Sequence, residues 1–236
     1  MRRTLRGVTS SEAPLSAAPA RVCVTLRSGR VHVEAGAEAI SVKGASFSTE
    51  PDGAVVVKGG AGAVSISCPD DTDIVIGSHA ARVTTDGKLG AVRISVTSGR
   101  VQVAEARELD VRTASGRVTV GRVKGALRCT AMSGRVEVGH AGSVDISVKS
   151  GRVEVGDTGD ARVHALSGRV EVGAGAGSTV EVKATSGRVA VTLPHGCCPA
   201  TNLSTRRGRI ENEIPTGSDG RVDVQTIAGR VSLAWR

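Results

Sequence analysis

Apolar and polar residues alternate along most of the chain, and the alternation is interrupted at a recurring Ser-Gly pair. In the segment VDISVKSGRVEVG (144–156), apolar side chains occupy alternate positions before the glycine and again after it. Alternation with a period of two is typical of a β-strand with one buried face. The Ser-Gly pair predicts a corner between two short strands, because glycine adopts the backbone angles that a tight turn needs.

This pattern returns at a nearly constant spacing. The string SGRV occurs seven times, with the variants RGRI and AGRV near the end, and the corner glycines are Gly29, Gly99, Gly116, Gly134, Gly151, Gly168, Gly187, Gly208 and Gly229. From Gly99 onward they lie 17–21 residues apart. Such a unit has no room for a helix, is too short for a propeller blade and lacks the leucine pattern of leucine-rich repeats. The sequence therefore predicts an all-β, β-helix-like solenoid, in which each turn of the chain, here called a rung, pairs with the rungs on either side.

Five positions in each rung are predicted to point into the core. Counted from the corner glycine, they are −7, −5, −3, +2 and +4, and the residues that we expect to be buried include Val136, Val138, Val153, Val155, Val163, Val170 and Val182. The chain has no Tyr, one Phe and one Trp among 236 residues, so small aliphatic side chains must fill the core. We expect a thin core between two closely spaced sheets.

The pattern also predicts domain boundaries. Residues 1–20 are rich in Ser, Ala, Pro and Arg without any period, which favours a disordered N-terminal tail. Residues 21–236 are predicted to form one solenoid domain. Within it, residues 36–90 fit the repeat poorly and are interpreted as irregular first rungs that cap one end, whereas residues 91–236 are interpreted as regular rungs.

The tandem repeats, preceded by VSISCPDDTDIVI (64–76), resemble a large bacterial family of β-strand-repeat proteins labelled "putative adhesin", which carries a domain of unknown function. The ending TNLSTRRGRIENEIP (201–215) resembles the close of actinobacterial members. The resemblance covers about residues 20–236 and implies a solenoid fold and, for some members, a link to cell-envelope stress. It supplies no catalytic residues. Members often carry Asp after the corner glycine, where this chain carries Arg.

That arginine forms the main candidate site. The residues at position +1, here called the arginine ladder, are Arg30, Arg100, Arg117, Arg135, Arg152, Arg169, Arg188, Arg209 and Arg230. They are predicted to point outward and to stack from rung to rung. Position +3 offers carboxylates in some rungs, namely Glu137, Glu154, Glu171 and Glu211, which favours a self-neutralising surface. In the rungs of Arg100, Arg117, Arg188 and Arg230, position +3 holds Gln102, Thr119, Ala190 and Ser232 instead.

The formal net charge of +8 adds to this picture. The candidate anion-binding residues are Arg100, Arg117, Arg135, Arg152, Arg169 and Arg188, and the anions considered are lipid headgroups, a wall polymer or a nucleic-acid backbone. Sequence-specific recognition of nucleic acid is not expected, because the repeats offer neither aromatic side chains for base stacking nor a helix.

Two other groups of residues have the composition of possible sites. Glu137, Glu154 and Glu171 would stack about 5 Å apart, which matches the carboxylate spacing of retaining glycosidases. We expect them to be exposed and paired with arginine, so a sugar-processing enzyme is a distant alternative. The loop PHGCCP (194–199) contains His195, Cys197 and Cys198, but adjacent cysteines share one ion poorly and structural zinc needs four ligands. No catalytic residue, metal site or cofactor is predicted.

The chain end suggests self-association. The ending AGRVSLAWR (228–236) still follows the repeat, so an uncapped last rung is predicted, with Val231, Leu233 and Trp235 joining two copies end to end as a homo-oligomer. The alternative is that Trp235 folds back over the last rung.

The remaining features concern location and function. The five scattered cysteines fit a reducing compartment. The sequence as given has no signal peptide or membrane span, which favours a cytoplasmic location and leaves association with the envelope open. We predict a non-enzymatic scaffold or adhesin-like protein that presents a flat repetitive surface to a macromolecular partner. The alternative is a polyanion-binding module.

Overall fold

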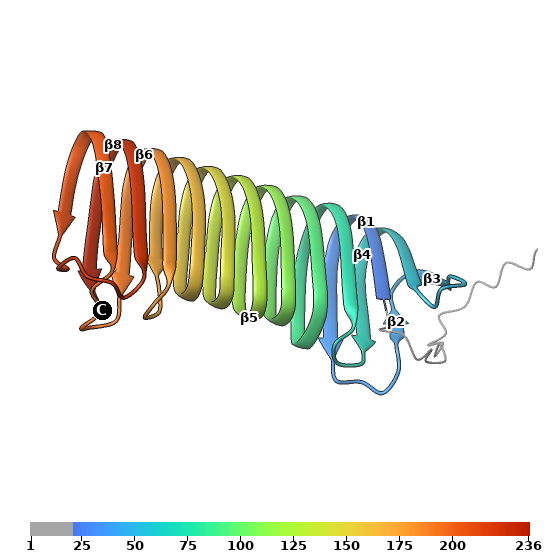
Figure 1. Cartoon of the computed structure of the whole chain (residues 1–236). Helices are drawn as coiled ribbons and strands as arrows, with labels where there is room; N and C mark the ends of the chain where they lie inside the picture. Colours follow the sequence, from blue (N-terminus) through green and yellow to red (C-terminus); the bar gives the residue numbers. More distant parts are fainter. Residues whose placement is uncertain (1–20) are drawn as a thin grey trace, which may run out of the picture.

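The structure is a computed structural model that describes residues 21–236 as one continuous β-solenoid (Figure 1). Its strands are β1 (Arg21–Ala35), β2 (Ser41–Lys43), β3 (Ser46–Thr49), β4 (Val55–Cys68), β5 (Asp73–Gly173), β6 (Thr179–Leu193), β7 (Ala200–Asn212) and β8 (Arg221–Trp235). The predicted all-β solenoid is confirmed. Within this range no helix is long and apolar enough to cross a membrane. The predicted tail, residues 1–20, lies outside the described residues.

Parallel pairing stacks the rungs with their corners aligned. β5 alone winds through six rungs, and β1, β4, β6, β7 and β8 contribute one each. The corner column runs, in spatial order, through Gly62, Gly29, Ala81, Gly99, Gly116, Gly134, Gly151, Gly168, Gly187, Gly229 and Gly208. At about 4.8 Å for each step, the rod is about 50 Å long.

The rungs at both ends are stacked out of chain order. β1 lies between β4 and the first part of β5, and β8 lies between β6 and β7. β1 and β8, the first and last strands in the sequence, are thus paired along both edges. The outermost rungs of the stack are β4 and β7 (Figure 1). Short antiparallel pairings with β2 and β3 cover the outer edge of β4.

Residues 36–90 are therefore more regular than their sequence indicates. They contain the complete rungs 55–68 and 73–86, whose corners are Gly62 and Ala81, and only β2 and β3 depart from the parallel stack. The corner Ala81 replaces the glycine of the repeat, which is why the rung 73–86 escapes a search for the Ser-Gly pair.

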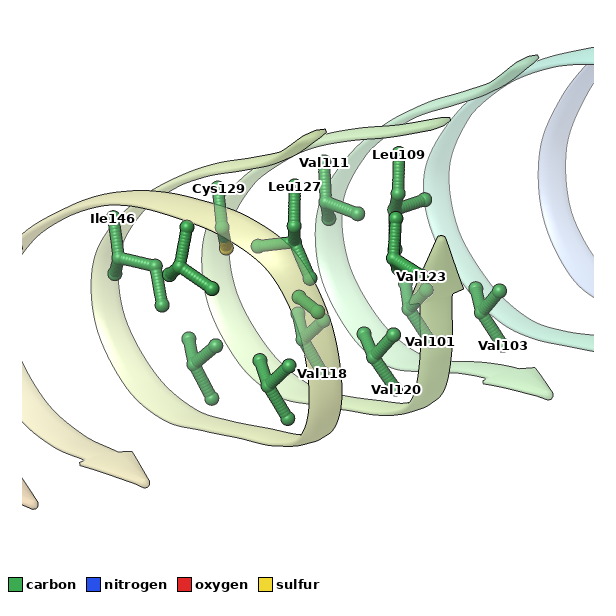
Figure 2. Close-up of a cluster of buried hydrophobic side chains, with 14 of the residues drawn as sticks. Val101, Val103, Leu109, Val111, Val118, Val120, Val123, Leu127, Cys129 and Ile146 are labelled. Atoms are coloured by element: carbon green, nitrogen blue, oxygen red, sulfur yellow. The ribbon is translucent and has the colours of Figure 1, made fainter. Parts of the chain in front are cut away.

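The core is a column of aliphatic side chains between two faces of the coil. Val153 is 1% exposed, and all seven valines predicted to be inward are buried, so the predicted register is confirmed. Figure 2 shows Leu109 and Val111 on one side of the core, facing Val118 and Val120 on the other. The two sides of the core lie close together, so the small aliphatic side chains that dominate the composition can fill the space between them.

The structure adds a sixth inward position that the repeat does not reveal. It lies in the short turn between rungs and is occupied by Leu89, Ala106, Val123, Ala141, Thr158 and Ala174, all at most 2% exposed. Alternation does not reveal this position, because only one residue of each turn is buried. Thr158 is compatible with this site because its hydroxyl donates a hydrogen bond to the Asp160 carbonyl at 2.9 Å.

The Ser-Gly pair has two separate roles at the corner. Gly151 has a φ of +138°, and a Cβ there would overlap the carbonyl oxygen of Gly134 in the neighbouring rung. The serine satisfies the backbone of that rung. The Ser167 hydroxyl donates to the Lys149 carbonyl at 3.4 Å, and the Ser186 hydroxyl donates to the Leu166 carbonyl at 3.4 Å. Close stacking therefore explains why the pair recurs.

Candidate functional site

The arginine ladder follows the corner on one side of the rod. Register pairs Arg30 with Arg82, Arg169 with Arg188, and Arg230 with both Arg188 and Arg209. Arg82 is thus a tenth member, which the sequence analysis missed because its rung has Ala81 at the corner. Among the rungs of residues 21–236, only β4 has no arginine at position +1. It holds Ala63 there, which pairs with Arg30.

The middle of the ladder is neutralised within its own rungs. Guanidinium and carboxylate atoms lie 3.3 Å apart in Arg135–Glu137 and Arg152–Glu154, and 3.8 Å apart in Arg169–Glu171. These side chains point outward as predicted, but pairing covers part of them: the side chains of Arg152 and Glu154 are 37% and 35% exposed. The predicted self-neutralising surface therefore exists in these three rungs.

The last two rungs share one carboxylate. Glu211 lies 4.0 Å from Arg209 and 3.9 Å from Arg230. Arg230 has Ser232 at position +3 of its own rung, as the sequence indicates, but it gains an acidic neighbour because β7 stacks on β8 and brings Glu211 from the adjacent rung.

Four consecutive arginines form an unneutralised stretch toward the other end. Within residues 21–236, no carboxylate lies within 4.0 Å of Arg30, Arg82, Arg100 or Arg117, which we call the unpaired arginine run. Position +3 in these rungs holds His32, Thr84, Gln102 and Thr119. Arg188 is likewise without an ion-pair partner in the described part of the chain, but it stands between paired arginines. At about 4.8 Å a step, the unpaired arginine run extends for about 14 Å.

A shallow groove accompanies the ladder. It has a volume of about 910 Å³, is lined by corner glycines and by the ladder from Arg82 to Arg152, and contains no acidic residue. Because the glycines have no side chains, the floor is backbone and the guanidinium groups form one wall. A long anion can lie in such a groove and contact several arginines at once.

The glutamate column is a poor candidate for catalysis. Glu137, Glu154 and Glu171 line a groove of about 620 Å³ without any aromatic residue. Each carboxylate is engaged by an arginine, and Glu137 also accepts a hydrogen bond from the Thr119 hydroxyl at 3.3 Å. A sugar would find neither a free carboxylate pair nor a stacking platform there.

The loop 194–199 packs against the chain end. The Trp235 indole donates a hydrogen bond to the Cys197 carbonyl at 3.1 Å, and its ring lies 5.0 Å from the ring of His195. In residues 21–236, no group of three or more His, Cys, Asp or Glu side chains is placed to hold a metal ion.

The candidate self-association residues do not lie at an end of the rod. Val231 and Leu233 are 0% and 1% exposed, and their strand β8 is covered by β7. The prediction of an uncapped last rung formed by residues 228–236 is wrong, because the chain goes out to β7 before it returns. The outermost rung, β7, mixes polar Thr201, Thr205 and Asn212 with apolar Leu203 and Ile210 at inward positions, and is thus less apolar there than the rungs inside the rod.

The buried cysteines are not nucleophiles. Burial raises the pKa of the Cys129 thiol to about 12, with a smaller contribution from Asp110. Burial also raises the pKa of Cys68. Both are core residues whose thiolate forms do not contribute at neutral pH.

Comparison with known proteins gives one family match and two remote similarities to solved structures. The family model described as Toastrack DUF4097 matches residues 17–234. No curated protein matches the chain. One similar solved structure is a "putative adhesin" from Parabacteroides distasonis ATCC 8503, with 11% identity, a TM-score of 0.34, and coverage of 97% of this chain and 96% of the other. Another is a "putative cell adhesion protein" from Clostridium sporogenes ATCC 15579, with 8% identity, a TM-score of 0.22, and coverage of 97% and 100%. Both similarities are remote, so the family assignment rests on the family model.

Proposed function

The chain belongs to the Toastrack DUF4097 family, and from this premise we propose that it is a non-catalytic scaffold that binds an extended polyanion along its arginine ladder. Enzymes gather different side chains around one reacting bond. Here an outward arginine recurs at position +1 in ten of the eleven described rungs, so this edge offers a series of similar contacts along the rod. Such an array suits a partner that is itself repetitive.

The observation that carries this proposal is the unpaired arginine run. Like charges about 5 Å apart repel one another, and an anion between them relieves the repulsion. The glutamates relieve it in the middle of the ladder, but Arg30, Arg82, Arg100 and Arg117 have no such carboxylate within residues 21–236. A bound polyanion would supply the missing charge.

The proposed recognition depends on charge and spacing. Guanidinium groups bind phosphate and sulfate with two parallel hydrogen bonds, which gives strong contacts without reading a monomer sequence. Binding should release counterions and therefore weaken steeply as salt rises.

The test is binding to heparin and to long-chain polyphosphate over a range of salt concentrations. In the triple variant Arg82→Gln/Arg100→Gln/Arg117→Gln, we expect affinity at low salt to fall about tenfold or more, and the slope of log affinity against log salt to decrease by about 2 to 3. Stability should change little, because these side chains are exposed and unpaired.

A matched control removes the same charge from another face. Arg112, Arg128 and Arg162 are exposed, lie on the strand before the corner and pair with carboxylates there. Their triple change to Gln should weaken binding much less. Equal losses in the two triple variants would mean that only net charge matters, and no binding by the unaltered protein at low salt would reject the proposed function.

A further inference from the structure

Large apolar side chains are exposed in one column of the rod. Met132, Leu166 and Ile227 are 52%, 55% and 50% exposed, and all three occupy position −2, just before the corner. Within residues 21–236 the fourth exposed large apolar side chain is Ile210, on β7 beyond the corner. Three such residues in one column are unusual for a protein surface and indicate a contact.

The column also contains cations. In the six rungs whose corners run from Gly134 to Gly208, position −2 holds, in spatial order, Met132, Lys149, Leu166, Thr185, Ile227 and Arg206, which we call the corner stripe. These residues line a groove of about 770 Å³ that contains Lys183 and His164 but no carboxylate. An apolar groove with positive side chains is complementary to a partner that is both apolar and anionic.

On the strand before the corner, acidic residues in these rungs begin only at position −6, whereas the glutamates at position +3 beyond the corner are paired with ladder arginines. Asp145, Glu181 and Asp223 lie at position −6 of their rungs, and each forms an ion pair, with Arg128, Arg162 and Arg221 respectively. Hydrogen bonds from Lys183 and Arg162 lower the pKa of Glu181. The complementary region is therefore a narrow strip along the corner and not the whole face.

The corner stripe and the arginine ladder flank the same edge. Only positions −1 and 0 separate position −2 from position +1, and both are small residues in every rung of the stripe except the last, where Arg207 precedes Gly208; the stripe therefore lies on one side of the corner and the ladder on the other. The two grooves also share the rungs 126–139 and 143–156. A flat surface laid against this edge would meet both.

We propose that the corner edge docks on an anionic lipid surface. Met132, Leu166 and Ile227 enter the boundary between headgroups and acyl chains, while the arginine ladder, Lys149 and Arg206 contact headgroup phosphates. This inference rests on the proposed function and names the partner of the ladder. A second copy of the chain fits less well, because two such edges would bring cations against cations.

The experiment measures sedimentation with vesicles of phosphatidylcholine alone and of phosphatidylcholine mixed with phosphatidylglycerol. The protein should bind the mixed vesicles and not the neutral ones. The variant Met132→Ser/Leu166→Ser/Ile227→Ser should bind the mixed vesicles about tenfold more weakly or worse, because three partly inserted side chains are lost. Its affinity for heparin should be unchanged, since the arginine ladder is intact.

A gain-of-binding pair provides a control that does not depend on loss of folding. Thr185 lies in the corner stripe, whereas Thr179 is exposed on the same strand far from the corner. Thr185→Leu should tighten binding to the mixed vesicles severalfold, and Thr179→Leu should leave it unchanged. Equal effects of the two substitutions would overturn the inference.

The remaining outcomes separate the two proposals. Binding to heparin without binding to mixed vesicles would overturn the lipid inference and leave the proposed function standing, whereas failure to bind either would reject both. Unchanged binding of the Met132→Ser/Leu166→Ser/Ile227→Ser variant to the mixed vesicles would show that charge alone holds the protein on the membrane, and would overturn the inference that these side chains enter it. A lipid-free dimer that the triple Ser change converts to a monomer would assign the corner stripe to a second copy and overturn the inference.

Discussion

Single residues in this solenoid are constrained by the rung above and the rung below. The corner glycine has no space for a Cβ, the serine before it donates a hydrogen bond to a carbonyl of the preceding rung, and the arginine after it points to water. The phrase SGRV is therefore mainly structural, and only its last outward residue is available to a partner. Residues that depart from the repeat therefore show most clearly what each position contributes to stability or binding.

Thr85 is one such exception. It is 0% exposed, its hydroxyl has no hydrogen-bond partner, and it stacks beside Val33. A buried hydroxyl without a partner costs about 1–3 kcal/mol. We expect Thr85→Val to raise the free energy of unfolding by about 1 kcal/mol, as measured by urea denaturation.

The matched substitution is Thr158→Val. Thr158 is 1% exposed as well, but its hydroxyl donates to the Asp160 carbonyl, so this change should destabilise the protein. A loss of stability in Thr85→Val would contradict the assignment of an unsatisfied hydroxyl at that position.

At the scale of strands, the out-of-order ends distinguish this structure from a simple coil. β1 and β8 are next to the outermost rungs, and each is hydrogen-bonded on both edges. The strand that closes the domain in sequence is thereby held between two others. Fraying should begin at β7, which pairs only with β8 among the described strands and has mostly exposed residues.

Amide hydrogen exchange can test this order. We expect the amides of residues 222–233 to exchange more slowly than those of residues 201–211, although β8 lies closer to the end of the sequence. Faster exchange in β8 than in β7 would contradict the stacking order.

The sequence is sufficient for the rung but not for the order of rungs. Alternation around each Ser-Gly pair predicted the register, the outward arginines and the buried valines such as Val153 and Val163. The swaps at the ends were not predictable, because every rung presents the same inward pattern and any two can stack corner to corner. The rung of Ala81 and its arginine, Arg82, could not be found from the Ser-Gly pair, because this rung has alanine at its corner. The corner stripe was missed because Met132, Leu166 and Ile227 each look like isolated exposed residues until the rungs are superimposed.

Residues 21–236 form a rod about 50 Å long, built from eleven rungs, with different chemistry along one edge. The unpaired arginine run occupies one half of this edge and the corner stripe the other. Because the rungs are fixed at about 4.8 Å, the charges form a linear array whose length is set by the fold. A linear array should distinguish ligands by their length as well as by their charge.

The most direct test of this account is the affinity of the unaltered protein for polyphosphates of increasing chain length at one low salt concentration. Affinity should rise steeply until the anion spans the unpaired arginine run, about 14 Å, and should increase only slowly beyond that length. In the Arg82→Gln/Arg100→Gln/Arg117→Gln variant, the steep part should be lost. A short polyphosphate that binds as tightly as a long one would place the anion at a single point on the protein and contradict the arginine ladder as its binding site.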